Sequence, residues 1–214
     1  MGSGSYQTDM SGMARVHGIV EKELGAAPRY VHAASQPDRV AAVASFYENL
    51  LEYIHVHHGS EDALLYPRLE ERCPDDLDSI QRVWAQHQLL EAPMAAARDA
   101  LDQWRKDPDA GRTSLSDAIG TVLEVLTPHC RDEEAVIVPL GSRYLSEAED
   151  AELRPYEQQH YRADKPWLML GLALEGFDEA HRTPLLAALP EARRIRWTDE
   201  WSPAFQALMS LVRP

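Results

Sequence analysis

The chain has 214 residues, of which 44% are hydrophobic and 7% aromatic, and its formal net charge at pH 7 is −14. This length and composition suit a soluble globular protein with one substantial core, or a core plus a subdomain. The charge argues against binding to nucleic acid or to an anionic membrane surface, because the Lys and Arg residues that would neutralise phosphates are scattered among acids.

Helical spacing of apolar residues begins near the N-terminus and predicts a first helix over residues 10–34. Gly25 and Pro28 are expected to bend or end this helix. A second helix is predicted from Pro37 to the breaking sequence around Pro74.

The next two predicted helices cover residues 77–104 and 115–140, with a loop at 106–112 between them. Pro128 interrupts the fourth helix, so either a new helix starts there, capped by Thr127, or the helix kinks. No stretch before residue 141 alternates like a strand. Four helices joined by short loops predict an all-α, antiparallel four-helix bundle.

Residues 142–214 are predicted to form an additional helical C-terminal extension. Ser146 and Glu149 have the spacing of a capping box, and residues 166–174 and 183–189 are two further apolar segments. The amphipathic tail, residues 195–211, is expected to pack on the bundle as a lid or as a dimer contact.

An eleven-residue segment occurs twice, at residues 57–67 and 129–139. Both copies have His at the first position, Glu at the fifth, an acid at the sixth, Ala at the seventh and Pro at the eleventh. Because helical residues four apart lie on one face, each copy presents an imidazole and a carboxylate in the same direction. The same four-residue spacing between His and Glu recurs in His17 with Glu21 and in His87 with Glu91, which indicates an internal duplication.

A bundle interior lined by four histidines and at least two carboxylates favours a pair of iron or manganese ions, since carboxylates bridge hard cations and imidazole binds iron. A single tetrahedral zinc would leave buried carboxylates without partners. Glu61 and Glu133 are predicted to bridge the two metals, while Glu91, one turn beyond His87, can reach the iron that His87 binds. The predicted metal ligands are His17, His57, Glu61, His87, Glu91, His129 and Glu133.

The remaining candidates are expected to lie outside the ligand set. His58 and Asp62 also have four-residue spacing, but a shift of one residue turns them about 100° from the stripe of His57, so we expect them around the ligands or at the surface. Glu21 is expected to be a solvated acid, and Cys130 to point away from the site. Four further histidines are not expected to bind metal: His32, His55, His160 and His181.

These motifs resemble those of the hemerythrin-like family of His-His-Glu cation-binding bundles. In that family the second and fourth helices carry His-x-x-x-Glu/Asp followed by proline. The resemblance covers residues 10–141 and implies a non-haem di-iron centre that reacts with O2, in some members with NO or peroxide, or that serves in iron sensing. The matching residues are His17, His57, Glu61, Pro67, His129, Glu133 and Pro139.

The sequence differs from the oxygen-carrying hemerythrins at one position that bears on the choice between possible functions. Those carriers have a second histidine four residues after the third-helix histidine, where this chain has Glu91. We therefore expect an oxygen-activating oxidoreductase that acts on a small substrate and uses an external electron donor. The alternatives are an O2 or NO carrier, scavenger or sensor, and an iron-responsive binding protein. A substrate-sized cavity between the metals and residues 142–214 would favour the first class, and a compact bundle the second.

Cellular location and assembly are only weakly indicated. No apolar run approaches the ~20 residues needed to cross a bilayer, and two cysteines are too few for a disulfide scaffold. We therefore expect a protein of the reducing cytoplasm, as a monomer or a homodimer.

Overall fold

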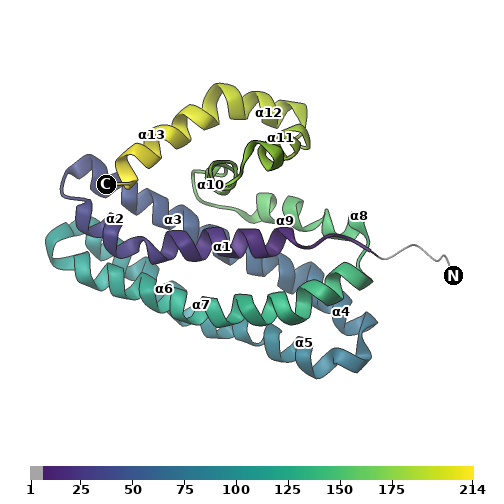
Figure 1. The fold of residues 1–214 in the computed structure, drawn as a ribbon. Coiled ribbons are helices and arrows are strands. Elements are labelled where there is room, and N and C mark those ends of the chain that lie inside the picture. The colour runs from purple at the N-terminus through teal and green to yellow at the C-terminus, as the bar shows by residue number, and fades with distance from the viewer. Residues whose placement is uncertain (1–6) are drawn as a thin grey trace.

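A computed structural model of the chain describes residues 7–214, which are almost entirely helical and contain no strand. The predicted all-α, antiparallel four-helix bundle with a helical C-terminal extension is confirmed (Figure 1). The first bundle helix is bent at Ala26, close to the predicted bend. The four bundle segments are built from α1 (Gly12–Gly25) with α2 (Ala27–Ala33), α3 (Pro37–Ser60), α6 (Gln86–Lys106) and α7 (Pro108–Tyr144).

The second bundle segment contains a wide helical turn that the sequence did not predict. After α3, residues Glu61–Leu65 form a π-helix, η1, which leads into α4 (Tyr66–Arg72). Pro67 explains this widening, because proline has no N–H to donate and its ring crowds the carbonyl one turn earlier. A second π-helix, η3 (Trp197–Trp201), likewise ends two residues before a proline, Pro203.

The third and fourth segments begin differently from the prediction. A 3-10 turn, η2 (Pro74–Asp76), leads into α5 (Leu77–Trp84), which a break at Ala85 separates from α6. The predicted loop at 106–112 is wrong, since only Asp107 separates α6 from α7. The Asp107 side chain caps α7 by accepting the Ala110 N–H at 3.1 Å, and Pro108 occupies the first turn, where its missing N–H costs no hydrogen bond. Helix α7 continues through Pro128 and Pro139.

The C-terminal extension forms an arch over the face of the bundle made by α1 and α3 (Figure 1). The capping box at Ser146 and Glu149 is present, as predicted. Tail residues such as Trp201 and Phe205 are buried, and α13 packs against α3. The extension comprises α8 (Glu147–Asp150), α9 (Leu153–His160), α10 (Leu168–Gly176), α11 (Glu179–Ala187), α12 (Glu191–Arg196), η3 and α13 (Ser202–Val212).

Ion pairs fasten both ends of the arch to the bundle. At the C-terminal end, Arg213 contacts the buried Glu23 of α1 at 3.3 Å and Glu175 of α10 at 2.6 Å. At the other end, Arg72 of α4 binds Glu149 at 2.5 Å, and this arginine holds the pKa of Glu149 at about 2, below its usual range. The extension is therefore tied to the bundle by charge as well as by apolar packing.

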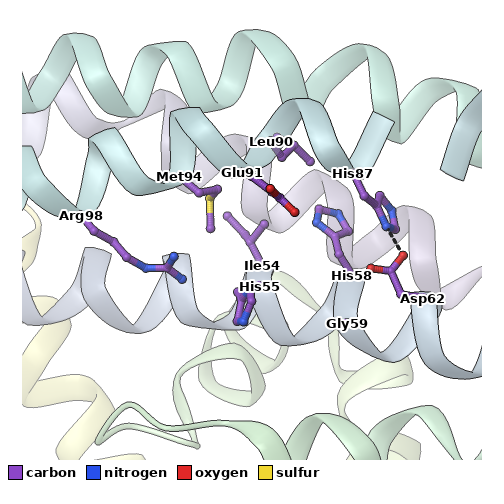
Figure 2. Close-up of a pocket in the computed structure, with 10 residues that line it drawn as sticks. All are labelled: Ile54, His55, His58, Gly59, Asp62, His87, Leu90, Glu91, Met94 and Arg98. Atoms are coloured by element: carbon purple, nitrogen blue, oxygen red, sulfur yellow. Dashed lines mark hydrogen bonds and ion pairs between the residues drawn. The ribbon is translucent and has the colours of Figure 1, made fainter. Parts of the chain in front are cut away.

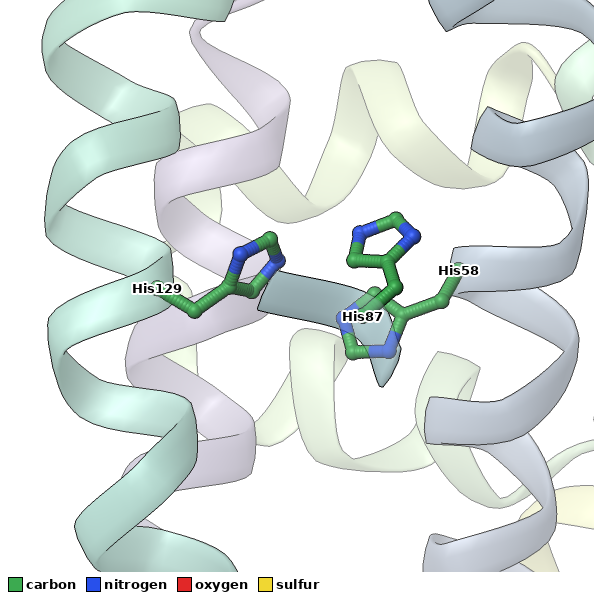
Figure 3. Close-up of side chains that lie close together, drawn as sticks. All are labelled: His58, His87 and His129. Carbon is green, nitrogen blue, oxygen red and sulfur yellow. The ribbon is translucent and has the colours of Figure 1, made fainter. Parts of the chain in front are cut away.

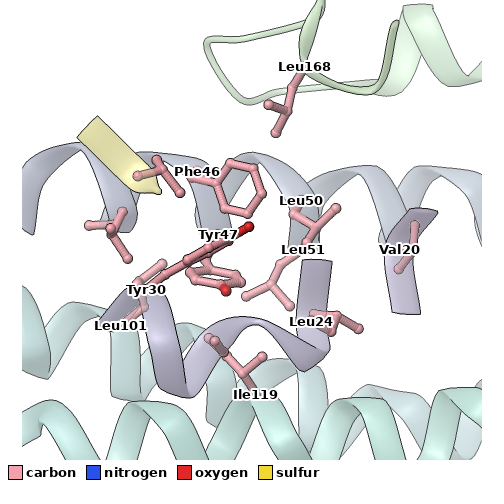
Figure 4. Packing of buried hydrophobic residues seen from close by; sticks show 14 of the residues in the cluster. Val20, Leu24, Tyr30, Phe46, Tyr47, Leu50, Leu51, Leu101, Ile119 and Leu168 are labelled. Carbon is pink, nitrogen blue, oxygen red and sulfur yellow. The ribbon is translucent and has the colours of Figure 1, made fainter. Parts of the chain in front are cut away.

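The hydrophobic core of the molecule is divided into two clusters. The larger cluster joins α1, α2, α3, α6 and α7 with the extension, around side chains such as Phe46, Tyr47 and Leu50 (Figure 4). The smaller cluster lies at the opposite end of the bundle and includes Leu65, Tyr66 and Ile137. Within the described range, no helix is both long and apolar enough to cross a membrane.

Candidate metal centre

A buried group of polar side chains lies between the two apolar clusters. Each bundle segment contributes one predicted histidine: His17 from α1, His57 from α3, His87 from α6 and His129 from α7. Glu61 and Glu133 lie among them, and both are 0% exposed. Helical spacing brings this about, because each histidine lies on the face that an apolar residue occupies one turn earlier, and Glu61 and Glu133 follow one turn later on two of the segments.

The inward-facing atoms of these six side chains have no hydrogen-bond partner. The atoms concerned are Nε2 of all four histidines, both oxygens of Glu61 and Oε2 of Glu133. Leaving such groups buried and unpaired costs about 1–3 kcal/mol each, and natural proteins rarely do so. These seven nitrogen and oxygen atoms face one interior volume and lack hydrogen-bond partners, so they are suited to coordinate a bound cation.

The two carboxylates each face histidines from two different segments. Glu61 lies 3.1 Å from His57 Nε2 through Oε1 and 3.8 Å from His87 Nε2 through Oε2. Glu133 Oε2 lies 3.3 Å from His17 Nε2 and 3.6 Å from His129 Nε2. These separations leave both acids between imidazoles of different helices, as a bridging role requires.

An outer ring of acceptors fixes the orientation of every imidazole. The Nδ1 atom of His17 lies 3.0 Å from Glu134, and that of His129 lies 3.2 Å from the amide oxygen of Gln86. When Nδ1–H donates to such a partner, the lone pair of Nε2 is left free for a metal. The other two histidines have the same arrangement: His57 with Glu157 at 3.0 Å and His87 with Asp62 at 2.7 Å.

The charge balance of the cluster also favours a cation. Burial and the adjacent Glu133 raise the pKa of Glu61 well above its usual range. Burial also raises the pKa of Glu133, but the imidazoles of His17 and His129 beside it outweigh burial and lower it to about 2. Tyr66 donates a 2.8 Å hydrogen bond to Glu133 Oε1. Positive charge between the two carboxylates, such as that of a bound cation, would favour the ionised form of both.

His58 joins this cluster, although the sequence analysis placed it outside the ligands. It is 8% exposed, and its ring centre lies 4.4 Å from that of His87 and 5.0 Å from that of His129 (Figure 3). One potential ligand atom from each of these three histidines falls within 4.8 Å of the others. Burial and the neighbouring imidazoles lower the pKa of His58, which keeps it neutral and able to bind metal.

The prediction for His58, a place around the ligands or at the surface, assumed a single inward face on the second helix. The rotation between His57 and His58 instead lets them face different neighbours. His57 meets His17 of α1, whereas His58 meets the histidines of α6 and α7. The donors thus form a pair, His17 and His57, and a triad, His58, His87 and His129, with the two carboxylates between them.

The comparison with known families agrees with this geometry. Residues 10–141 match the hemerythrin HHE cation binding domain. The chain belongs to this family. No curated protein and no solved structure matches closely enough to extend the comparison. This hemerythrin-like protein therefore carries the cation-binding bundle of its family, and its buried histidines and carboxylates are the residues that can hold the metal.

Glu91 is not brought into the cluster. Its side chain is exposed on the wall of a 260 Å³ cavity, which also reaches His58 and His87 (Figure 2). Glu91 is absent from both sets of side chains close enough to share a metal. His87, the predicted ligand one turn before Glu91, has its Nδ1 atom 2.7 Å from Asp62.

A very small void lies on the His17 and His57 side of the cluster. Its volume is about 10 Å³, enough for one water-sized molecule. Its wall includes Val16 and Tyr53, and also Cys130, which the sequence analysis expected to point away from the site. Both cysteines of the chain are free and buried.

The variant His58→Ala is expected to weaken cation binding about tenfold or more, because even the loss of an outer partner of a ligand costs 10–100-fold. Titration with Co²⁺, followed by its visible absorption, measures this effect. His55→Ala is the matched control, since His55 lies on the same helix and is exposed. Unchanged Co²⁺ affinity and spectrum in His58→Ala would remove His58 from the ligand set.

Proposed function

We propose that this chain is a non-haem di-iron protein that activates O2 to oxidise a small substrate, with electrons from an external donor. Manganese is the alternative metal, as both are hard cations that accept imidazole and carboxylate ligands. Glu61 and Glu133 would bridge the two ions. His17 and His57 would bind one ion, and His58, His87 and His129 the other. When bound, the iron pair supplies the electrons that reduce O2.

The division of histidines supports a reaction with a diatomic gas. The ion at His17 and His57 would have one imidazole fewer than its neighbour, and the 10 Å³ void lies on that side. Apolar walls at Val16 and Leu126 restrict the void to small molecules and keep bulk water away. This feature suits O2 and NO equally, so NO binding is the second candidate function.

A substrate-sized cavity between bundle and extension is the observation that carries the proposal for an enzyme over a carrier. This cavity has a volume of about 230 Å³ and is lined by residues of both parts. Val16 and Tyr53 form part of its wall and also part of the wall of the void. The Tyr53 ring stacks on His57 at 5.7 Å, so one side chain separates a bound substrate from a metal ligand.

Three side chains beside the proposed metal site, Glu157, Tyr53 and Tyr66, would have specific roles in such a reaction. Glu157 of the extension holds His57 in place by accepting a hydrogen bond from its Nδ1 atom. Burial raises the pKa of Tyr53, with added contributions from Glu157 and Glu61, so its hydroxyl keeps its proton beside the cavity. Burial likewise raises the pKa of Tyr66, whose proton stays in the hydrogen bond to Glu133.

Rapid mixing of the reduced, iron-loaded protein with O2 tests this proposal. We expect irreversible conversion to a ferric pair, with no oxygenated form that survives removal of O2. Return of the ferrous spectrum after degassing would establish reversible carriage and overturn the enzyme proposal. A stable nitrosyl with NO, combined with no reaction with O2, would favour an NO sensor or scavenger. Zinc-loaded protein, which cannot change its oxidation state, is the control.

A further inference from the structure

The cavity between bundle and extension has an apolar floor. Side chains from α3, α10 and α11 contribute Val56, Met169, Leu170 and Leu185 to it. The cavity is lined by residues of α1 and α3 and by residues of the extension, which crosses these two helices (Figure 1). A cavity of about 150 Å³ accommodates benzene, so 230 Å³ leaves room for roughly nine or ten non-hydrogen atoms of a ligand.

Positive charge is concentrated around this cavity, although the chain as a whole carries a net charge of −14. Three cationic residues line it, Arg154, Lys165 and Arg193, against one acid, Glu157. Glu157 is already committed to His57 through a 3.0 Å contact. Lys165 is paired with Asp164 at 2.7 Å, just outside the cavity lining. The lining therefore has a surplus of positive charge that the chain itself does not neutralise.

Neither arginine has a carboxylate within salt-bridge distance, and the one acid outside the lining on which the charge of Arg154 is seen to act is Asp150. Across residues 7–214, the side chains of Arg154 and Arg193 form no salt bridge and no hydrogen bond. Arg193 is half-buried and lies over the ring of Trp201 at 5.7 Å. Burial lowers the pKa of Arg193, and repulsion from the nearby Arg154 adds a smaller lowering. An anion between them would relieve this repulsion and accept their free N–H groups.

We propose that this cavity binds an amphipathic carboxylic acid of about ten non-hydrogen atoms. Its carboxylate would lie on Arg154 and Arg193, and its apolar chain would pack on Val56, Met169 and Leu185. The apolar floor favours such an acid over inorganic phosphate, which has no apolar part to bury. The further statement that this acid is the substrate rests on the proposed function, because Tyr53 lies between the cavity and His57.

Calorimetric titration of the iron-loaded ferric protein with octanoate tests the site, without any electron donor. Octanoate is expected to bind one equivalent. Arg193→Ala and Arg154→Ala are each expected to weaken binding about tenfold or more, since hydrogen bonds to a charged group contribute about 1.5–3 kcal/mol. Arg193→Lys is expected to retain part of the affinity. Arg194→Ala, an exposed neighbour outside the cavity lining, should bind as the unaltered chain does.

Two comparison ligands make the result specific to an amphipathic acid. Octan-1-ol, which lacks the charge, and inorganic phosphate, which lacks the chain, should both bind at least tenfold more weakly than octanoate. Equal binding of octanol, equal binding of phosphate, absence of octanoate binding, or insensitivity to both arginine variants would each overturn the site. Because no oxygen chemistry takes place in this titration, octanoate can bind even if the proposed function fails, and the two failures are distinguishable.

Discussion

Purified with iron, the variants His57→Ala and His129→Ala are expected to keep at most one iron per chain, where two are expected in the unaltered chain. Each substitution removes one imidazole and leaves a carboxylate, Glu61 or Glu133, without its neighbour at 3.1 or 3.6 Å. Metal ligands and the folding of their site are coupled, so the loss of one ligand weakens the whole pair. Metal analysis after exhaustive dialysis gives the number of irons directly.

His55→Ala and His32→Ala are the controls for this measurement, since both histidines are exposed and lie outside the cluster. They are expected to keep both irons. If His57→Ala or His129→Ala also kept both, the four-helix arrangement of ligands would be wrong. Loss of iron from the control variants would instead indicate a general loss of folding, which circular dichroism of the same samples detects.

Removal of the metal with a chelator is expected to lower the melting temperature by about 10 °C. Binding at a few hundred times Kd stabilises a protein by about 3–4 kcal/mol, and each kcal/mol shifts the melting temperature of a chain of this size by about 2–4 °C. The physical origin is the set of seven inward-facing atoms that lack hydrogen bonds in the protein alone. Differential scanning calorimetry before and after chelation, and after iron is restored, measures the effect.

The same chelator should leave the melting temperature of a double variant, His57→Ala with His129→Ala, unchanged, because that protein has already lost its metal. Equal melting of the loaded and chelated forms of the unaltered chain would show that the cluster is satisfied without a cation. That result would contradict the charge balance inferred for Glu61 and Glu133.

The parts of the site that depend on one helix could be predicted from the sequence. The pairs His57 with Glu61 and His129 with Glu133 follow from the four-residue spacing alone, and the structure places both pairs in the interior. The bundle itself followed from the period of the apolar residues. Helix propensity, turn residues and hydrophobic spacing all act over a few residues, which is why these elements could be recognised.

The parts that depend on packing between segments could not be predicted in this way. His58 is inward because α6 and α7 approach its side of α3, and Glu91 is outward although it has the spacing of a ligand. The outer acceptor Glu157 lies 100 residues from His57 in the chain, and no local pattern links them. The widened turn at Glu61–Leu65 had a local signal in Pro67, because a proline two residues after a helical turn can widen it.

The hydrogen bond between His57 and Glu157 makes the arch thermodynamically sensitive to the metal. An imidazole that binds a cation becomes a stronger N–H donor, so metal binding should hold α9 more tightly against α3. Linkage is reciprocal, and anything that lifts α9, such as a partner protein or a substitution in the arch, must lower cation affinity by the same factor. A segment that contributes no ligand can thereby set how readily the bundle takes up and releases its metal.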